Sequence, residues 1–262
     1  MTVPLTSVPN LRDIGGYRSA EGGRVRHGVL YRSTDLSRLT EPDEQEFARL
    51  RIATVYDLRT VDERTAAPDR LPAGTRALDL DVLADKRLRA IPAQMLAVIA
   101  DPSIADRELG GGRAEEYFVG SYRDFVTLPS AVSAYRALFG DLAALPDDGP
   151  ALVHCTTGKD RTGWATASLL LLLGVDEDDV FQDYLLTNEL LLPALGEVFE
   201  RFAAAGGDPE LLEPVLGVRP EYLHAALATV REHFGSIEGY FGTGLGLGED
   251  VQTALRERLI TA

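Results

Sequence analysis

The chain has 262 residues, 45% of them hydrophobic, which describes a globular protein of one large domain, or one domain with an insertion. Its formal charge of −15 argues against nucleic acid and anionic membranes as partners. A single cysteine excludes an intramolecular disulfide.

The sequence shows neither a secretory signal at the N-terminus nor an apolar run long enough to cross a bilayer. We therefore expect no integral membrane association, and a location in the cytoplasm or export by a route that needs no signal peptide. The oligomeric state is left open.

Short β-branched or apolar segments alternate with helical patterns along the chain. The segments predicted to be strands are 29–31, 52–58, 77–80 and 151–154. Helix starts are predicted at Thr40, Asp176 and Pro220, and a strongly apolar helix over 160–173 is predicted to end at Gly174. This alternation predicts an α/β fold with a central, mainly parallel sheet flanked by helices, in a single domain spanning residues 1–262.

A segment at about 84–126 interrupts this plan after the third predicted strand. It contains apolar helical stretches at 91–99 and 115–125, on either side of the glycine-rich ELGGGR. An insertion of this length is either a helical lid over a site or a helical pair packed on the sheet, and both interpretations stay open.

The single cysteine, Cys155, lies in the stretch VHCTTGKDRTG, between a predicted buried strand and an apolar helix. In a strand–loop–helix unit, the backbone N–H groups of the loop and the positive end of the helix dipole converge on one point. A cysteine at the start of such a loop has its thiolate stabilised there. Arg161, six positions later, supplies a planar guanidinium that can bind two oxygens of a phosphate or sulfate.

Three more residues of the stretch fit the same chemistry. Gly158 allows the backbone to turn with its N–H groups inward. Thr162 can place a hydroxyl near the sulfur and assist its departure from a covalent intermediate, and His154 can fix the loop by a side-chain hydrogen bond. Together they predict a nucleophile that attacks phosphorus and forms a phosphocysteine, which water then hydrolyses. An inert core thiol is disfavoured, because the charged residues at 159–161 are unusual neighbours for a core atom.

Other loop chemistries fit less well. A nucleotide-binding P-loop requires a glycine where Val153 stands. Zinc binding lacks ligands with the usual spacing, so we expect no metal and no cofactor. A sulfurtransferase, which also holds a reactive cysteine in such a loop, stays open as an alternative.

The loop HCTTGKDRT resembles that of the cysteine-dependent protein tyrosine phosphatases, in particular a bacterial subgroup with the pattern HCxxGKDRT. Further matches to that subgroup are NLRDIGGY (10–17), LYRSTDLSRLT (30–40), VYDLRT (55–60) and VRPEYLHAALATVREHFGSIEGYF (218–241). The resemblance implies a four- or five-stranded parallel sheet, a helical lid over the site and activity on phosphotyrosine. In several members it also implies activity on phosphoserine/threonine and phosphoinositides.

By position, the resemblance makes Cys155 the nucleophile and Arg161 the phosphate-binding arginine. Lys159 and Asp160 match the Lys-Asp pair that marks the subgroup. The remaining loop positions are filled by Thr156, Thr157, Gly158 and Thr162. The segment 84–126 matches poorly.

The general acid that protonates the leaving oxygen is expected just past the third predicted strand, at Asp81. The local alignment slips by a residue or two, so Asp79 and Asp85 stay open, and such carboxylates are also often loop or cap residues. Asp160 is a further candidate for the acid, or for orienting the water, with a helix N-cap as the alternative interpretation.

Other charged residues have two interpretations each. Lys159 is either a solvated cation or, as we favour, a second positive charge for substrates with more than one phosphate. Arg59 is expected at the same sheet edge as the loop, where it supports substrate binding or forms a salt bridge with Asp57, Asp62 or Glu63. Bracing of the loop by hydrogen bonds is expected from Asn10, Arg12, Asp13 and Arg32.

The sequence therefore predicts a metal-independent phosphomonoester hydrolase of the tyrosine-phosphatase type, acting on phosphorylated proteins or phosphoinositides. The alternative outside catalysis is a silent module that binds phosphorylated ligands.

Overall fold

A sheet of five strands, in the order β1–β2–β5–β3–β4, forms the centre of the computed structural model, which describes residues 5–86, 101–145 and 149–261. The strands are β1 (Arg12–Asp13), β2 (Leu30–Ser33), β3 (Thr54–Asp57), β4 (Arg76–Asp79) and β5 (Ala151–His154). The last four overlap the predicted segments, and β1 is an addition to them.

Strands β2, β5, β3 and β4 run parallel, and β1 pairs antiparallel with β2. Strands β2, β3 and β5 are buried at every position, as expected for parallel strands covered on both faces. Because these strands are parallel, the loops that follow β2, β3, β4 and β5 emerge at one edge of the sheet. The predicted α/β fold with a mainly parallel sheet is confirmed.

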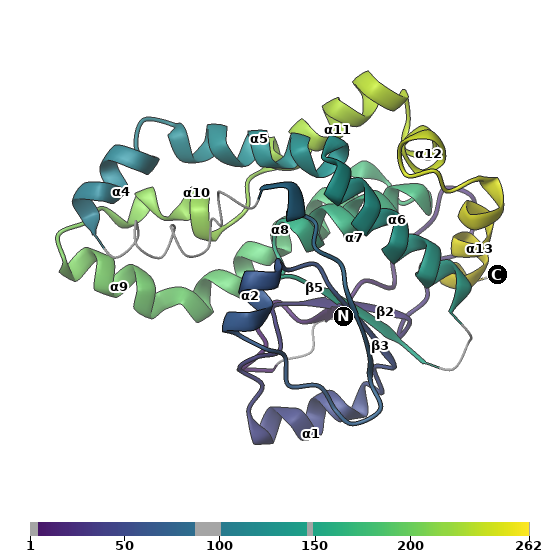
Figure 1. Cartoon of the computed structure of the whole chain (residues 1–262), viewed down its shortest axis with the longest axis horizontal. Coiled ribbons are helices and arrows are strands. Elements are labelled where there is room, and N and C mark those ends of the chain that lie inside the picture. The colour runs from purple at the N-terminus through teal and green to yellow at the C-terminus, as the bar shows by residue number, and fades with distance from the viewer. Residues whose placement is uncertain (1–4, 87–100, 146–148, 262) are drawn as a thin grey trace.

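Helices cover both faces of this sheet. They are α1 (Glu41–Arg49), α2 (Val61–Ala66), α4 (Pro102–Leu109), α5 (Arg113–Thr127), α6 (Pro129–Ala144), α7 (Arg161–Leu172), α8 (Glu177–Leu191), α9 (Gly196–Ala204), α10 (Glu213–Leu216), α11 (Pro220–Phe234), α12 (Ile237–Gly239) and α13 (Glu249–Leu259). Short turns of 3₁₀ or π-helix are η1 (Ala84–Lys86), η2 (Leu192–Leu195), η3 (Pro209–Leu211) and η4 (Tyr240–Gly244). In Figure 1, α1 lies below the sheet, α6 to α8 lie above it, and α4, α5, α9 and α10 form a lobe to its left.

Helix α7 is enclosed on almost every side, which explains why its sequence is apolar all round. Trp164 is fully buried, and its indole N–H donates to the hydroxyl of Tyr240 at 3.2 Å. Gly174, with φ of 74°, terminates the helix as predicted, and the Asp176 side chain caps the start of α8 as predicted. The rigid start of α7 fixes the far end of the loop at 155–160.

The described part of the 84–126 insertion is helical. Helix α5 includes the predicted stretch 115–125, whereas the stretch 91–99 lies outside the described residues. Tyr122, Phe125 and Phe118 of α5 are buried, and the Phe118 ring stacks on that of Tyr222 from α11 at 5.2 Å between centroids. Helix α5 is thus packed against neighbouring helices, and its role as a lid stays a prediction.

Among the helices of the described ranges, none combines the length and the apolar character that crossing a membrane requires.

Candidate active site

The loop at 155–160 follows β5 directly and leads into α7. Cys155 lies at its start and is 1% exposed. Gly158 has φ of 64°, and a Cβ built there would lie 2.1 Å from the carbonyl oxygen of Ser33. Glycine is therefore required both by the left-handed backbone and by the close approach of β2.

The carbonyl groups of residues 155–158 all accept hydrogen bonds from outside the loop. The donors are, in order, His154 Nδ1 (3.2 Å), the Asp35 amide (3.2 Å), Asn10 Nδ2 (3.3 Å) and, for residue 158, both Asn10 Nδ2 (3.1 Å) and Arg32 Nη2 (2.8 Å). In a trans peptide the following N–H points opposite to the carbonyl. The amides of 156–159 therefore point to the inside of the loop, and they donate to no group in the part of the chain that the structure describes. The loop is a cradle of N–H groups beside a cysteine.

Arg161 extends from the first turn of α7 toward Glu63 of α2. Its Nη1 and Nη2 each lie 2.7 Å from one carboxylate oxygen of Glu63, so the pair is bidentate. Nη1 also donates to the Leu58 carbonyl at 3.3 Å. The Glu63 carboxylate accepts further hydrogen bonds from the Thr156 hydroxyl and the Thr60 amide. One carboxylate thus joins α2, the loop and α7.

The charges of this pair stabilise each other. Burial would raise the pKa of Glu63, but the Arg161 charge and hydrogen bonds lower it to about 2. Burial would lower the pKa of Arg161, but the Glu63 carboxylate raises it. Because Glu63 takes the end of the guanidinium, the edge that carries Nε stays available for an anion.

Sequence reasoning considered Glu63 only as a partner of Arg59, so its contact with Arg161 is new. One part of the signal was visible, since Thr60 and Glu63 form a capping box at the start of α2. A capping glutamate has one oxygen turned to its own backbone, but the sequence does not show that the carboxylate also faces α7.

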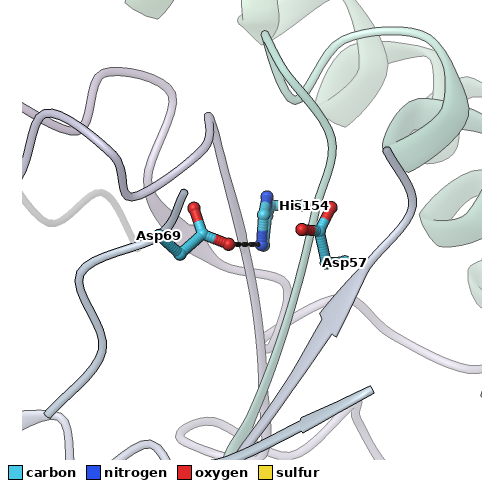
Figure 2. A group of neighbouring side chains, drawn as sticks. All are labelled: Asp57, Asp69 and His154. Carbon is cyan, nitrogen blue, oxygen red and sulfur yellow. Dashed lines mark ion pairs between the residues drawn. The ribbon is translucent and has the colours of Figure 1, made fainter. Parts of the chain in front are cut away.

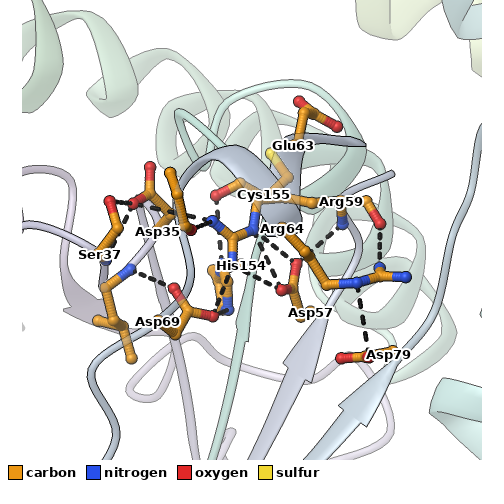
Figure 3. Close-up of polar contacts among 12 residues, drawn as sticks. Asp35, Ser37, Asp57, Arg59, Glu63, Arg64, Asp69, Asp79, His154 and Cys155 are labelled. Atoms are coloured by element: carbon orange, nitrogen blue, oxygen red, sulfur yellow. Dashed lines mark hydrogen bonds and ion pairs between the residues drawn. The ribbon is translucent and has the colours of Figure 1, made fainter. Parts of the chain in front are cut away.

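A buried ion-pair network centred on Arg59 lies behind the loop (Figure 3). The Arg59 guanidinium lies 2.7 Å from Asp57 and 2.8 Å from Asp69. His154 Nε2 lies 3.1 Å from Asp69, at ion-pair distance rather than in an aligned hydrogen bond. Burial would lower the pKa of His154, but Asp69 and Asp57 raise it. A protonated His154 can donate from Nδ1 to the Cys155 carbonyl while Nε2 faces Asp69.

The expected salt bridge between Arg59 and Asp57 is present. The other expectation for Arg59, support of substrate binding by direct contact, does not fit this geometry, because the side chain is 1% exposed and is saturated by Asp57, Asp69 and the Ala67 carbonyl. The guanidinium is buried and already paired with two carboxylates, so it is not available to bind a substrate.

A cavity of about 910 Å³ opens onto the loop. Its base includes loop residues Thr156, Thr157, Lys159, Asp160 and Arg161, whereas Glu63 is not among its lining residues. One wall is rich in hydroxyl groups from the N-terminal segments, and the other is apolar, with residues of α5, η2, α9 and α10. An anion in the cradle would therefore be attached to a group that occupies this cavity.

The sequence profile of a family described as the tyrosine phosphatase family matches residues 3–261. The chain belongs to the tyrosine phosphatase family.

Named relatives agree with this membership. Triple specificity protein phosphatase PtpB of Mycobacterium tuberculosis is 32% identical over 256 residues, which cover 88% of this chain and 89% of that protein. A Cupriavidus necator protein assigned as a tyrosine-protein phosphatase is 30% identical over 251 residues, covering 91% of this chain and 82% of that protein. A tyrosine-protein phosphatase of Nostoc commune is 28% identical, with 88% and 74% covered. The chain is thus a phosphatase, as the loop predicts.

The Lys-Asp pair of this phosphatase forms an internal ion pair. Lys159 Nζ lies 2.8 Å from the Asp160 carboxylate and 4.1 Å from the centre of the Phe118 ring. Lys159 is 4% exposed, so the interpretation as a solvated cation is wrong. Its use for a second phosphate stays a prediction, and Asp160 already offsets the charge.

Asp160 occupies the position before α7, but its side chain makes no capping hydrogen bond. It accepts instead from Lys159 and from the hydroxyl of Tyr122 on α5, at 3.2 Å. That hydroxyl lies 2.6 Å from the hydroxyl of Tyr184 on α8. Asp160 is thus the N-cap residue of α7 by position, but its carboxyl does not cap the helix and belongs to a polar cluster beside the cavity.

The carboxylates after β4 have local structural roles. Asp81 accepts from the amides of Leu83 (3.0 Å) and Val61 (3.3 Å), as a turn and cap residue does. Asp85 accepts from the amide of Ser130, and Asp79 lies 3.5 Å from Arg64 at the surface. None of the three is among the described residues that line the cavity.

Asp57, Asp69 and His154 could be mistaken for a metal site (Figure 2). One ligand atom from each lies within 4.8 Å of the others. Arg59, however, is paired with both carboxylates, so a guanidinium already supplies the positive charge that a cation would bring. We therefore interpret the cluster as a structural support of the loop.

The other residues expected to support the loop differ in what they bind. Asn10 and Arg32 bind loop carbonyls as expected, whereas Asp13 binds the amides of Gly15 and Gly28 and braces a different segment. The Thr162 hydroxyl is buried and has no hydrogen-bond partner within the described ranges, so its expected contact with the sulfur is not formed here.

Proposed function

We propose that the chain hydrolyses phosphomonoesters without a metal, through a covalent phosphocysteine at Cys155. The observation that carries this proposal is the set of inward N–H groups at 156–159, next to the cysteine and with no protein partner in the described ranges. Such donors bind the oxygens of a tetrahedral phosphorus centre and cost no reorganisation during the reaction.

The chemical steps require few groups. The Cys155 thiolate attacks phosphorus, the bond from phosphorus to the leaving oxygen breaks, and that oxygen takes a proton from a carboxylic acid. Water then attacks the phosphocysteine and gives a proton to the carboxylate that acted as the acid, the sulfur–phosphorus bond breaks, and inorganic phosphate and the thiolate are released. Arg161 binds two of the phosphoryl oxygens along its free edge while Glu63 holds its end.

We assign the acid role to Asp160 in preference to Asp81. The Asp160 carboxyl lines the cavity beside the loop, and Tyr122 and Lys159 hold it in place. Asp81 is engaged by two backbone amides and does not line the cavity. Geometry must come before pKa in such an assignment, because the acid has to reach the leaving oxygen.

We propose phosphotyrosine as the primary substrate group, with phosphoserine/threonine and phosphoinositides as further substrates. The breadth rests on the size of the cavity, about 910 Å³, and on its mixed walls, one rich in hydroxyls and one apolar. The name of the M. tuberculosis relative, a triple specificity protein phosphatase, agrees with this breadth.

The test is a hydrolysis assay in the presence of a chelator, with p-nitrophenyl phosphate, a phosphotyrosine peptide and a phosphoinositide. We expect turnover by the wild type, unchanged by the chelator, and none by Cys155→Ser. Binding of the phosphopeptide without turnover would favour a silent binding module, and transfer of sulfur from thiosulfate would favour a sulfurtransferase. Unchanged activity of Cys155→Ser would overturn the assignment of the nucleophile.

A further inference from the structure

A buried group of three charged residues lies behind the loop, and it does not line the cavity. It consists of Arg12, Arg32 and Asp183, none more than 2% exposed. Arg12 Nε lies 3.0 Å from one carboxylate oxygen of Asp183, and Arg32 Nη1 lies 2.9 Å from the other. Arg12 Nη2 also donates to the Asp183 carbonyl at 2.9 Å. A single carboxylate on α8 therefore holds two arginines from the first two strands.

The charges of this group do not balance one another. Two cations share one anion, and burial together with the Arg12 charge lowers the pKa of Arg32 to about 10. Burial would raise the pKa of Asp183, but the two arginines lower it to about 2. Replacing buried ion pairs with apolar residues is often neutral or stabilising. We therefore look for the role of this group in the residues that it holds in position.

Arg32 connects Asp183 to the loop in one step. Its Nη1 is fixed between Asp183 and the Thr166 hydroxyl, at 2.9 and 2.8 Å. Its Nη2 is thereby directed at the Gly158 carbonyl, 2.8 Å away. The planar guanidinium makes these directions interdependent, because its nitrogens cannot turn separately.

Arg12 connects Asp183 to the loop in two steps. Its Nη1 binds both the backbone carbonyl and the side-chain oxygen of Asn10. With that oxygen engaged, Asn10 turns its Nδ2 to the carbonyls of Thr157 and Gly158, at 3.3 and 3.1 Å. Asn10 itself has φ of 64°, which Asn tolerates better than most residues.

We propose that Asp183 is a positioning residue of the phosphate-binding loop. By holding Arg12 and Arg32, it keeps the carbonyls of residues 157 and 158 outward, and so directs the amides of residues 158 and 159 at the substrate. The inference rests on the proposed function, because it takes those amides to be the donors to phosphate. It adds a buried residue of α8 that does not line the cavity.

The test measures oxyanion binding without turnover. Tungstate, a tetrahedral oxyanion, is titrated by calorimetry into the Cys155→Ser protein, and then into the same protein carrying Asp183→Asn or Asn10→Gly. Asp183→Asn keeps the shape of the side chain and removes its charge, and Asn10→Gly removes Nδ2 where φ is positive. We expect tungstate to bind about tenfold more weakly in each, because loss of one preorganised donor has effects of at least this size.

The control is Asp141→Asn, which breaks a carboxylate contact with Tyr56 and Arg76 on the far part of the sheet. It is expected to lower the melting temperature and to leave tungstate affinity unchanged. If folded Asp183→Asn also loses melting temperature but keeps full affinity, Asp183 is merely structural and the proposal is overturned. If Asp183→Asn does not fold, Asn10→Gly decides alone, and unchanged affinity there overturns it equally.

The same experiment separates this inference from the proposed function. If the Cys155→Ser parent binds no tungstate and the wild type hydrolyses no phosphomonoester, the proposed function fails and the inference with it. If the parent binds tungstate and the wild type is active, only the variants bear on Asp183.

Discussion

The segments that follow β3 and β4 look alike in sequence but behave differently in the structure. Each carries several charged residues just past a parallel strand, at the sheet edge where the loop also lies. At the end of β3 and after it, Asp57, Arg59 and Glu63 are enclosed and paired, and they support the loop or Arg161. At the end of β4 and after it, Asp79, Asp81 and Asp85 bind backbone amides or Arg64.

The comparison shows that position after a strand does not by itself make a carboxylate functional. The two segments differ in burial: the carboxylates at and after β3 are enclosed with a fixed counter-charge. An enclosed carboxylate needs a specific partner, whereas an exposed one does not. In this phosphatase the enclosed set reaches the loop at 155–160 through Asp69 and His154, and reaches Arg161 through Glu63.

Among variants outside the nucleophile, the largest effect is expected from Asp160→Asn, which removes the proton that the leaving oxygen needs. Loss of a general acid typically costs about 10²–10⁴-fold. We expect a loss of about a hundredfold in kcat on phenyl phosphate and a much smaller loss on p-nitrophenyl phosphate, whose leaving group needs little protonation. Steady-state assays with both esters check this, and equal losses on the two would contradict the acid role.

A smaller effect is expected from Glu63→Gln, which leaves Arg161 buried without its counter-charge. We expect kcat/KM to fall by about tenfold or more, because the guanidinium loses its orientation. Assays at several phosphate concentrations check this, since the inhibition constant for phosphate should rise with it. Unchanged phosphate inhibition would mean that Arg161 is held by other contacts.

Glu63 also predicts a pH dependence of stability. Its pKa is lowered in the folded chain to about 2 from an ordinary value of 4.5, so its contribution is present above about pH 4.5 and is lost as the pH falls toward 2. The shift corresponds to about 3 kcal/mol at neutral pH. Urea unfolding at pH 7 and pH 3 should show a difference between wild type and Glu63→Gln that shrinks at the lower pH. A difference independent of pH would exclude the ion pair as its origin.

The smallest effect is expected from Asp81→Asn. Asparagine can keep the turn to Leu83, so kcat/KM on a phosphotyrosine peptide should change by less than about threefold. A loss of a hundredfold would show that the segment after β4 moves over the site and carries the acid, and it would reverse the comparison with β3.

The sequence predicted the strands β2 to β5, the helix α7 and the loop, because strand composition, glycine positions and the spacing of Cys155 and Arg161 are local signals. It could not predict the contacts of Glu63 or Asp183. Glu63 is 98 positions from Arg161, and Asp183 is 171 positions from Arg12. Such pairs depend on where the fold places α2 and α8, which local sequence signals do not show. The preference for Asp81 as the acid rests on its position just past a strand, and its distance to the cavity, which depends on packing, is not visible in the sequence.

The most direct test of the account is to look for the phosphocysteine itself. Protein is mixed with p-nitrophenyl phosphate, quenched with acid during turnover, and digested for mass spectrometry of the peptide that contains Cys155. The account predicts a peptide heavier by one phosphoryl group on Cys155, present in the wild type and missing in Cys155→Ser. Turnover without any adduct on Cys155, together with activity in Cys155→Ser, would contradict it.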